Sequence, residues 1–410
     1  MAFAPQARAQ AKLNTTQFVV VGEGLAAGMA DFTLKEVYQD LNFGAQMARQ
    51  MKTAFPQPLF QSAGIGSAPG YTSLPAILPG TLQGSVRSQF PPQLFVFNIS
   101  VPGMTVADSL TRRPVSPVVH QRDVQQTTIN MILGYPALIA GTGKPLWTQA
   151  EYAVALNPTL VVVELGYYEV LAPAVQNDIT RLPDVATFRT NLGTLLSRIK
   201  SVSPQIVVMS IPDPFDTAYF TNLAGVTRLT GVSADTLTRT FGLRADDLVT
   251  PNGLMIIGNS TIASSARLYL GTQFTTLQAS YPGTVVTAAT RTAVQARLAQ
   301  LNTEVANAAK DAGAQLYDLA ALFRTVRAQG LTVGGKRLTA DYLGGFYSLD
   351  GYYPGVTAHA AIANEMLGLL NRTYSMSFAL LDMTKAMSDD PATRFTPASA
   401  HKRPTREVTQ

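Results

Sequence analysis

The chain has 410 residues, of which 46% are hydrophobic, so it can bury a large core in one elaborated α/β domain or in a domain with a substantial insertion. Its formal net charge of +5 is spread along the chain, and the one group of basic residues, at 401–406, is too small to indicate a nucleic-acid-binding protein. The absence of cysteine excludes a thiolate nucleophile and any cysteine-ligated metal site.

Residues 1–11 resemble the small-residue end of a secretory signal peptide. Ala7-Arg8-Ala9 and Ala9-Gln10-Ala11 both fit the A-x-A cleavage pattern, whereas the basic and long apolar parts of a signal peptide are missing. We therefore interpret residues 1–11 as a signal-peptide remnant and expect a secreted or periplasmic protein, with association with the outer membrane as one option. No run of about twenty apolar residues occurs, which predicts no transmembrane segment.

Five short apolar runs have the length and composition of strands that are buried on both faces of a parallel sheet. They are residues 18–21, 94–99, 160–165, 206–211 and 315–319. Helical stretches alternate with these runs, at about residues 34–51, 187–199, 292–309 and 357–370. This alternation predicts a three-layer α/β/α fold with a five-stranded parallel sheet, and ligands are expected at the carboxyl ends of its strands.

Two regions depart from a minimal fold of this kind. Residues 56–92 are rich in Gly, Pro, Ser and Gln and predict a long loop near the strand ends, and residues 221–288 predict an inserted cap region. Near the end of the chain, residues 378–381 are expected to pack on the body, and residues 386–410 to form a flexible tail. The main domain is therefore expected to span residues 12–385.

Four short blocks follow predicted strands or precede the last helix, so we expect them to meet at one edge of the sheet. They read Gly22-Glu23-Gly24-Leu25, Val101-Pro102-Gly103, Gly166-Tyr167-Tyr168-Glu169 and Asp350-Gly351-Tyr352-Tyr353-Pro354. In this order the blocks resemble the active site of the SGNH/GDSL hydrolases, a family of esterases and lipases, with most of its chemistry removed. The resemblance implies a flavodoxin-like arrangement of the three layers.

The resemblance assigns a family position to one residue or more of each block. Gly24 stands at the position of the nucleophilic serine, Tyr353 at that of the histidine base, and Tyr168 at that of the oxyanion-hole asparagine. Gly103 keeps the glycine of the oxyanion hole, and Asp350 keeps the aspartate of the last block. The segments Phe55-Pro56-Gln57-Pro58-Leu59 and Ile211-Pro212-Asp213-Pro214-Phe215 look like those of a bacterial, envelope-associated branch of the family.

The substituted positions predict that the chain is not a hydrolase. Acyl transfer needs an activated nucleophile, a base within hydrogen-bond reach of it, and donors aimed at the developing oxyanion. Glycine has no side chain that could attack, and a tyrosine, with a pKa near ~10, is a poor base at neutral pH. Removing the serine or histidine of such a triad costs about six orders of magnitude in turnover.

Other residues could stand in for the missing ones. Of the three histidines, His401 lies in the polar tail, His359 is expected to be structural, and His120 lies in a proline-rich region from which it could reach the cleft. Three carboxylates also lie near the former site, at Glu23, Glu169 and Asp350. These carboxylates could take part in acid/base catalysis or bind a metal, but we favour the interpretation that Glu23 and Asp350 make hydrogen bonds to backbone turns. We expect no metal and no cofactor.

Four tyrosines, Tyr167, Tyr168, Tyr352 and Tyr353, come from two loops that are expected to meet at the former catalytic centre. Their rings could plug the cleft, or they could form a platform that stacks on a sugar or covers a lipid chain. Together with Glu23 and Glu169, these tyrosines are the candidate ligand-binding residues.

Three functions remain open from the sequence. The first is an exported pseudoenzyme that serves as a binding or assembly component of the cell envelope, with a lipid, ester or glycan in the former cleft or with an envelope protein as partner. The second is an active esterase or lipase-type hydrolase with non-standard catalytic residues. The third is a structural subunit of an envelope or extracellular assembly.

Overall fold

The structure is a computed structural model that describes residues 13–61, 95–120, 123–139, 141–258, 284–390 and residue 393. Four expectations from the sequence fall wholly or partly outside the described residues. These are the signal-peptide remnant at 1–11, most of the loop at 56–92, the middle of the inserted region at 221–288, and most of the tail at 386–410, which includes His401.

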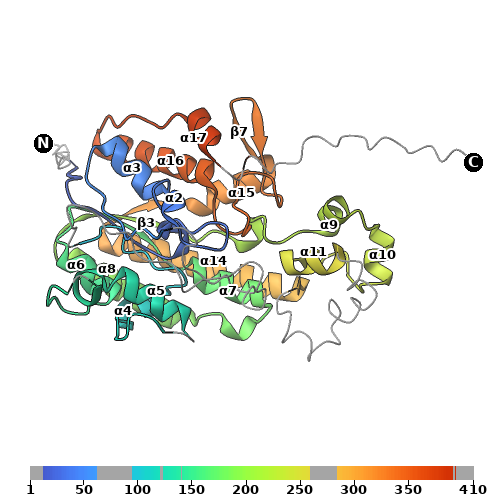
Figure 1. Ribbon diagram of the computed structural model, residues 1–410, viewed down its shortest axis with the longest axis horizontal. Helices are drawn as coiled ribbons and strands as arrows, with labels where there is room; N and C mark the ends of the chain where they lie inside the picture. Colours follow the sequence, from blue (N-terminus) through green and yellow to red (C-terminus); the bar gives the residue numbers. More distant parts are fainter. Residues whose placement is uncertain are drawn as a thin grey trace, which may run out of the picture.

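A four-stranded parallel sheet with the strand order β1-β2-β3-β6 lies at the centre of the described chain (Figure 1). Its strands are β1 (Phe18–Gly22), β2 (Leu160–Glu164), β3 (Gln205–Met209) and β6 (Gln315–Tyr317). In the register of the sheet, Val20 lies opposite Val162, which in turn lies opposite Val207. The valine-rich composition of β1, β2 and β3 reflects a sheet that is buried on both faces. The predicted α/β fold with a parallel sheet is confirmed.

The fifth predicted strand, at residues 94–99, is not a regular strand where the structure describes it. The chain runs parallel to β1 and bonds to it at both sides of Val20, whose N–H donates to Phe97 O (2.9 Å) and whose carbonyl accepts from Ile99 N (3.0 Å). The opposite neighbour of this segment is a loop, since Phe97 N donates to Pro56 O (2.7 Å). The Asn98 side chain turns inward and donates to Ala26 O (3.0 Å). Further along, Val101 N donates to Gly22 O (3.0 Å), but the Ile99 carbonyl accepts from the Gln149 side chain (2.9 Å), so the ladder with β1 stays incomplete.

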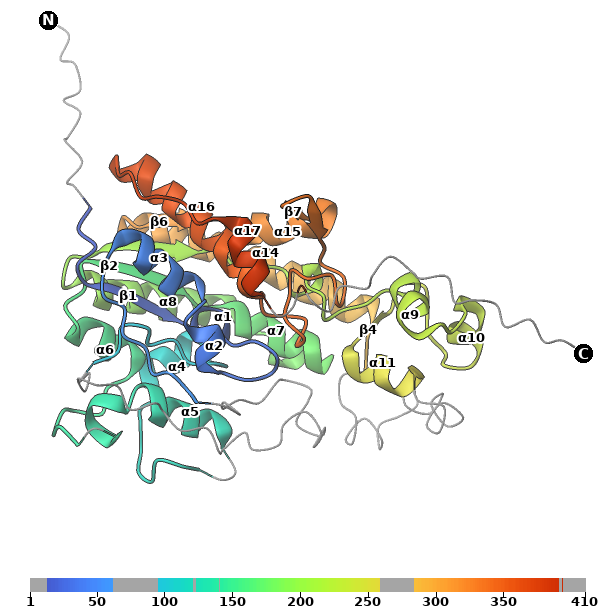
Figure 2. The same cartoon turned by 45° about the horizontal axis from the view of Figure 1, so that its top comes forward.

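Helices lie on both sides of the sheet (Figure 2). On one side α3 (Phe43–Met51) packs against α16 (Val356–Tyr374), which α17 (Met383–Asp389) also contacts. On the other side α8 (Val185–Lys200) contacts α4 (Val106–Thr111), α6 (Gln149–Ala155) and α14 (Ala288–Ala312). The other helical segments of the main body are α1 (Gly24–Ala27), α2 (Glu36–Gln39), α5 (Val124–Ile132), η1 (Tyr135–Ile139), α7 (Tyr167–Gln176), η2 (Ile179–Arg181), η3 (Pro214–Asp216) and α15 (Leu319–Gln329).

Three of the four predicted helices are confirmed, as α8, α14 and α16. The stripe predicted to face the sheet in α14 is buried, at Val294, Leu298, Leu301 and Val305. The helix predicted at 34–51 is wrong in its extent, because two helices, α2 and α3, occupy this stretch. Asn42 separates them, since its side chain accepts a hydrogen bond from Ala45 N (2.8 Å) and caps the second helix.

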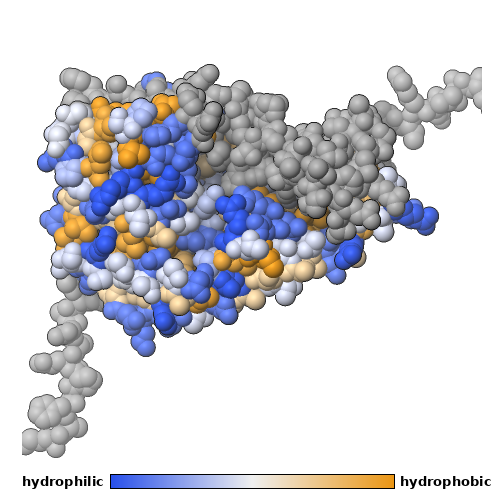
Figure 3. Space-filling view, turned by 90° about the horizontal axis from the view of Figure 1, so that it is seen from below, coloured by the Kyte–Doolittle hydropathy of each residue, from blue (hydrophilic) through white to orange (hydrophobic). Residues whose placement is uncertain are grey.

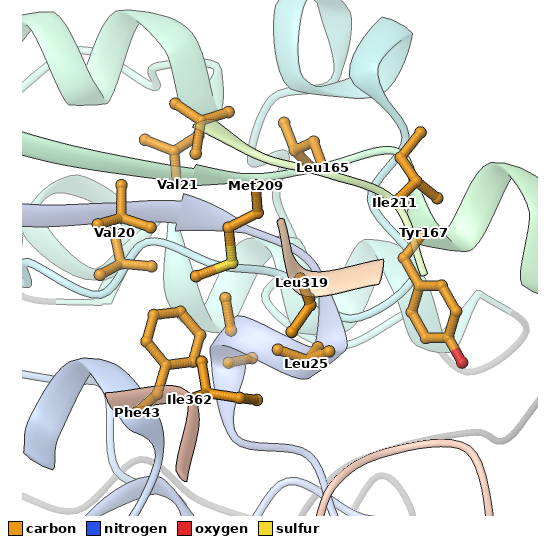
Figure 4. Packing of buried hydrophobic residues seen from close by; sticks show 14 of the residues in the cluster. Val20, Val21, Leu25, Phe43, Leu165, Tyr167, Met209, Ile211, Leu319 and Ile362 are labelled. Carbon is orange, nitrogen blue, oxygen red and sulfur yellow. The ribbon is translucent and has the colours of Figure 1, made fainter. Parts of the chain in front are cut away.

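One hydrophobic core joins the sheet to the helices of both sides. Figure 4 shows Phe43 of α3 and Ile362 of α16 side by side, below Val20 and Met209 of the sheet. Leu25 of α1 and Leu319 of α15 complete this part of the core. The outer surface is mixed: hydrophilic and hydrophobic residues are interspersed over the described part of the face in Figure 3. None of the described helices is long and apolar enough to cross a bilayer.

The inserted region has a hydrophobic cluster of its own, which includes Val226, Leu237 and Phe241. It contains α9 (Leu223–Thr230), α10 (Ala234–Arg239), α11 (Pro251–Gly258) and a short antiparallel pair, β4 (Leu248–Val249) and β5 (Val285–Val286). These elements lie at one end of the molecule, away from the central sheet (Figure 1). They are joined to the body near α7, where Thr287 N donates to Asn177 Oδ1 (3.3 Å).

The chain after α16 folds back on that helix. Asn371 and Phe378 exchange hydrogen bonds of 2.8 and 2.9 Å, and Asn364 and Leu381 exchange bonds of 2.7 and 3.1 Å, so the predicted packing of residues 378–381 is confirmed. The boundary predicted between residues 385 and 386 falls inside α17. Beyond this helix, the buried Asp390 accepts a hydrogen bond from Thr357 N (2.7 Å) in the first turn of α16. A small hairpin, β7 (Leu331–Val333) with β8 (Lys336–Leu338), completes the described elements.

Candidate functional site

The four blocks meet at the carboxyl ends of β1 and β2, as expected. Glu23, directly after β1, donates its N–H to Glu164 O at the end of β2 (3.1 Å). Tyr167 at the start of α7 donates its hydroxyl to Tyr352 O (3.1 Å) in the loop before α16. Tyr353 in the same loop donates its hydroxyl to Glu23 Oε2 (2.7 Å).

The carboxyl group of Glu23 lies at the centre of the site and is fully buried. Besides the Tyr353 hydroxyl, it accepts a hydrogen bond from Leu25 N (3.1 Å). Burial raises the pKa of Glu23, and these hydrogen bonds, together with the nearby backbone amides of Gly24 and Gly103, partly oppose the rise. The amide of Gly103, which the family resemblance assigns to an oxyanion, therefore lies close to a carboxyl group of the same chain.

The space at Gly24 is filled by Tyr353. A Cβ atom at position 24 would overlap the Tyr353 hydroxyl and would lie 2.5 Å from the ring carbon Cζ. The ring cannot move away easily, because Tyr353 is 1% exposed and packs against Tyr352 at a centroid distance of 4.7 Å and against Tyr167 at 6.3 Å. Gly24 and Tyr353 thus fit together, because the tyrosine ring occupies the space that a side chain at position 24 would need.

Three of the four candidate tyrosines are enclosed by protein. Tyr167, Tyr352 and Tyr353 are at most 1% exposed, and Tyr219 adds a further ring that contacts Tyr352 at 5.3 Å. Burial raises the pKa of Tyr353 well above its ordinary value, so its hydroxyl keeps its proton. The three rings are packed together at the carboxyl ends of the strands, whereas Tyr168 is only half-buried.

Asp350 holds the loop that carries Tyr353. Its buried carboxyl group accepts hydrogen bonds from Tyr353 N (2.9 Å), Tyr352 N (3.1 Å) and Phe32 N (3.5 Å). Burial raises its pKa to about 7, and the backbone hydrogen bonds limit the rise. The interpretation of Asp350 as an acceptor for backbone turns therefore fits the structure.

Glu164 also belongs to the site, although the sequence analysis did not identify it. Its Oε2 atom accepts from Glu23 N (3.2 Å) and Ala26 N (3.3 Å), and burial followed by the charge of Glu23 raises its pKa well above the ordinary value. Among the described residues no salt bridge includes Glu23 or Glu164. The signal in the sequence that could have identified Glu164 is its position directly after four apolar residues of a buried strand.

Glu169 is the buried carboxyl group with an incomplete set of partners. Its Oε1 atom accepts from Val106 N (2.6 Å), while Oε2 has no hydrogen-bond partner among the described residues. Burial raises the pKa of Glu169 to about 7. Tyr168, the preceding residue, lies beside Gly103, whose positive φ of 76° a side chain would disfavour.

Neither described histidine bonds to the Glu23–Tyr353 pair. His359 is buried and accepts from Phe43 N through Nδ1 (3.3 Å), and burial lowers its pKa to about 3, which agrees with a structural role. The His120 ring contacts Val115 O (3.3 Å) within its own loop. In the part of the chain that the structure describes, no group of three or more histidine, aspartate or glutamate side chains is arranged to hold a metal ion.

Comparisons with known proteins give little further information. No protein-family model and no curated protein matches the chain. Among solved structures, the chain is similar to phospholipase A1 from Streptomyces albidoflavus NA297, with 12% sequence identity, a TM-score of 0.35, and coverage of 88% of this chain and 99% of that chain. A likeness this distant carries no argument about the site, so its interpretation rests on the geometry of this chain.

Proposed function

We propose that this chain is an SGNH-hydrolase-like protein that does not hydrolyse esters and that serves as an exported binding or assembly component of the cell envelope. Two observations support the relation to that family. The blocks occur in the order of the family's motifs, and they lie together at the carboxyl ends of parallel strands. One fold can host different functions, so a protein can keep the fold of a hydrolase family and lack its reaction.

The loss of hydrolysis is carried by one observation, which is that Tyr353 occupies the space at Gly24. Two requirements of acyl transfer are unmet there. Position 24 has no nucleophile and no room for one, and the tyrosine at the base position keeps its proton. The Gly103 amide, which the resemblance assigns to the oxyanion, lies close to the buried carboxyl group of Glu23.

The test is hydrolysis of p-nitrophenyl acetate and p-nitrophenyl butyrate by the purified protein, beside a mock purification. We expect the rate to equal that of the mock preparation. The control variant is Tyr353→Phe, which keeps the ring and removes only the hydroxyl. Turnover above the mock that this variant loses would show that the site is an active hydrolase with non-standard residues. Turnover that the variant keeps would locate the activity elsewhere.

Export is the part of the proposal that depends on residues 1–11 and on the resemblance to the envelope-associated branch. Cell fractionation tests it. Because residues 1–11 lack the basic and apolar parts of a signal peptide, those two parts of a bacterial signal peptide are placed before them. In a bacterial host we expect cleavage at Ala9 or Ala11 and the cleaved chain in the periplasm or the medium. Export without cleavage at either A-x-A pattern, or retention in the cytoplasm, would contradict the role of residues 1–11.

A further inference from the structure

A cavity of about 280 Å³ lies beside the Glu23–Tyr353 site, between α4, α7 and α8. Its inner wall is apolar and includes Val106, Ala172 and Phe188, all of which are buried. Tyr168 lines it from the first turn of α7. The exposed residues Arg181 and Asp184 lie at its opening. The cavity thus has an apolar interior and a charged rim, which is the usual construction of a small-molecule site.

Glu169 supplies the polar group inside this cavity. The residue is 8% exposed, and it lines the cavity together with Val106, whose N–H donates to its Oε1 atom (2.6 Å). The second oxygen, Oε2, is buried and has no hydrogen-bond partner among the described residues. A buried oxygen without a donor is unfavourable unless a bound molecule supplies one.

The charges around Glu169 indicate the sign of the charge on that bound molecule. The carboxylates of Glu23 and Asp108 both raise the pKa of Glu169, and no cationic side chain among the described residues is paired with it. Arg181 at the opening donates to Gln176 Oε1 and is exposed, so solvent screens its charge. An anionic ligand would meet like charges inside the cavity, whereas a cation would meet a carboxyl group without a counter-ion.

We propose that this cavity binds a small primary ammonium ion with a compact apolar body, whose N–H groups pair with Glu169 Oε2. The apolar body would contact Val106, Ala172 and Phe188, and the rings of Tyr168 and Phe188 add the attraction of aromatic faces for a cation. This inference rests on the proposed function, because it names the class of ligand that the proposed binding protein would take. Binding is measured without hydrolysis, so the two proposals fail independently.

The experiment compares three probes of similar shape by calorimetric titration of the full chain: benzylamine, benzyl alcohol and phenylacetate. We expect benzylamine to bind at least tenfold more tightly than benzyl alcohol, and phenylacetate more weakly than either. In Glu169→Gln, a substitution of equal shape that retains an acceptor for Val106 N, the preference for the amine should disappear. In the control Asp235→Asn, the same kind of substitution at an exposed carboxylate outside the cavity, it should persist.

Several results would overturn the inference. They are equal affinity of the wild type for the amine and the alcohol, tightest binding of phenylacetate, absence of binding by all three probes, and an unchanged preference for the amine in Glu169→Gln. The comparison of the amine with the alcohol uses the wild-type protein, so it decides the question even if Glu169→Gln does not fold.

Discussion

The carboxyl groups of Glu23 and Glu169 are both buried and come from neighbouring blocks, but their surroundings differ. Glu23 receives hydrogen bonds from the Tyr353 hydroxyl and from the Leu25 amide, and the Tyr353 ring fills the space beside it at Gly24. Glu169 has one oxygen without a partner among the described residues and borders a cavity. The comparison teaches that the place where Gly24 meets Tyr353 is the closed part of the site, and that the adjacent wall at Glu169 is the part with room for a ligand.

The largest expected effect comes from adding a side chain at the closed position. Gly24→Ala should reduce the free energy of unfolding by about 3 kcal/mol, because the new Cβ overlaps the enclosed Tyr353 ring. Urea denaturation measures the loss. The control is Gly193→Ala in α8, where a Cβ meets nothing within 4 Å and stability should stay equal or rise slightly. Equal stability of the two variants would mean that the site is not closed.

The second effect concerns the pH dependence at Glu169. Its pKa is raised to about 7 in the folded protein, so its contribution to stability is complete below the unfolded pKa of about 4.3 and is lost as the pH rises through about 7. Glu169→Gln should therefore match the wild type near pH 4 and exceed it by on the order of 2 kcal/mol near pH 8.

Denaturation at several pH values measures this difference. Glu23, Glu164 and Asp350 also have raised pKa values, so the wild type and the variant should share a remaining slope of the same sign. Asp235→Asn, at a side chain that is 66% exposed, serves as the control and should leave the pH profile unchanged. If the free energy of unfolding of Glu169→Gln changed with pH in the same way as that of the wild type, the raised pKa of Glu169 would be contradicted.

The smallest effect is the loss of a single donor to Glu23. Tyr353→Phe should reduce the free energy of unfolding by about 1 kcal/mol, since one buried oxygen loses its hydroxyl partner while the ring packing remains. Thermal denaturation at pH 7 measures it. Tyr374→Phe, which removes a part-buried hydroxyl bonded to Gln205, is the matched control and should cost less. If both variants lost the same free energy of unfolding, the Tyr353–Glu23 hydrogen bond would contribute no more to stability than the bond of Tyr374.

Much of the fold could be predicted because it depends on local patterns. The runs of valine and leucine at β1, β2 and β3 indicate buried strands, and the spacing of the apolar residues in α14 indicates the face that is buried. The segment at 94–99 is also apolar but has no complete ladder, because the Ile99 carbonyl accepts from the Gln149 side chain and Phe97 N donates to Pro56 O in a loop. Such contacts depend on the path of the chain, which no periodicity encodes.

The candidate site was predictable as a meeting of blocks but not as a set of contacts. The order of the blocks indicates that Glu23 and Tyr353 lie near each other, and the structure places them 2.7 Å apart. The short distance between the Gly103 amide and Glu23, and the role of Glu164, depend on side-chain positions that only the folded chain defines. For the same reason, the sequence could not distinguish the enclosed Tyr353 from the half-buried Tyr168.

The mutual fit of Gly24 and Tyr353 makes the two positions depend on each other. A serine placed alone at position 24 would collide with the tyrosine ring, and a histidine placed alone at position 353 would leave Glu23 without its hydroxyl donor. Either single substitution therefore yields a less stable protein, so these two residues can be exchanged at low cost only together.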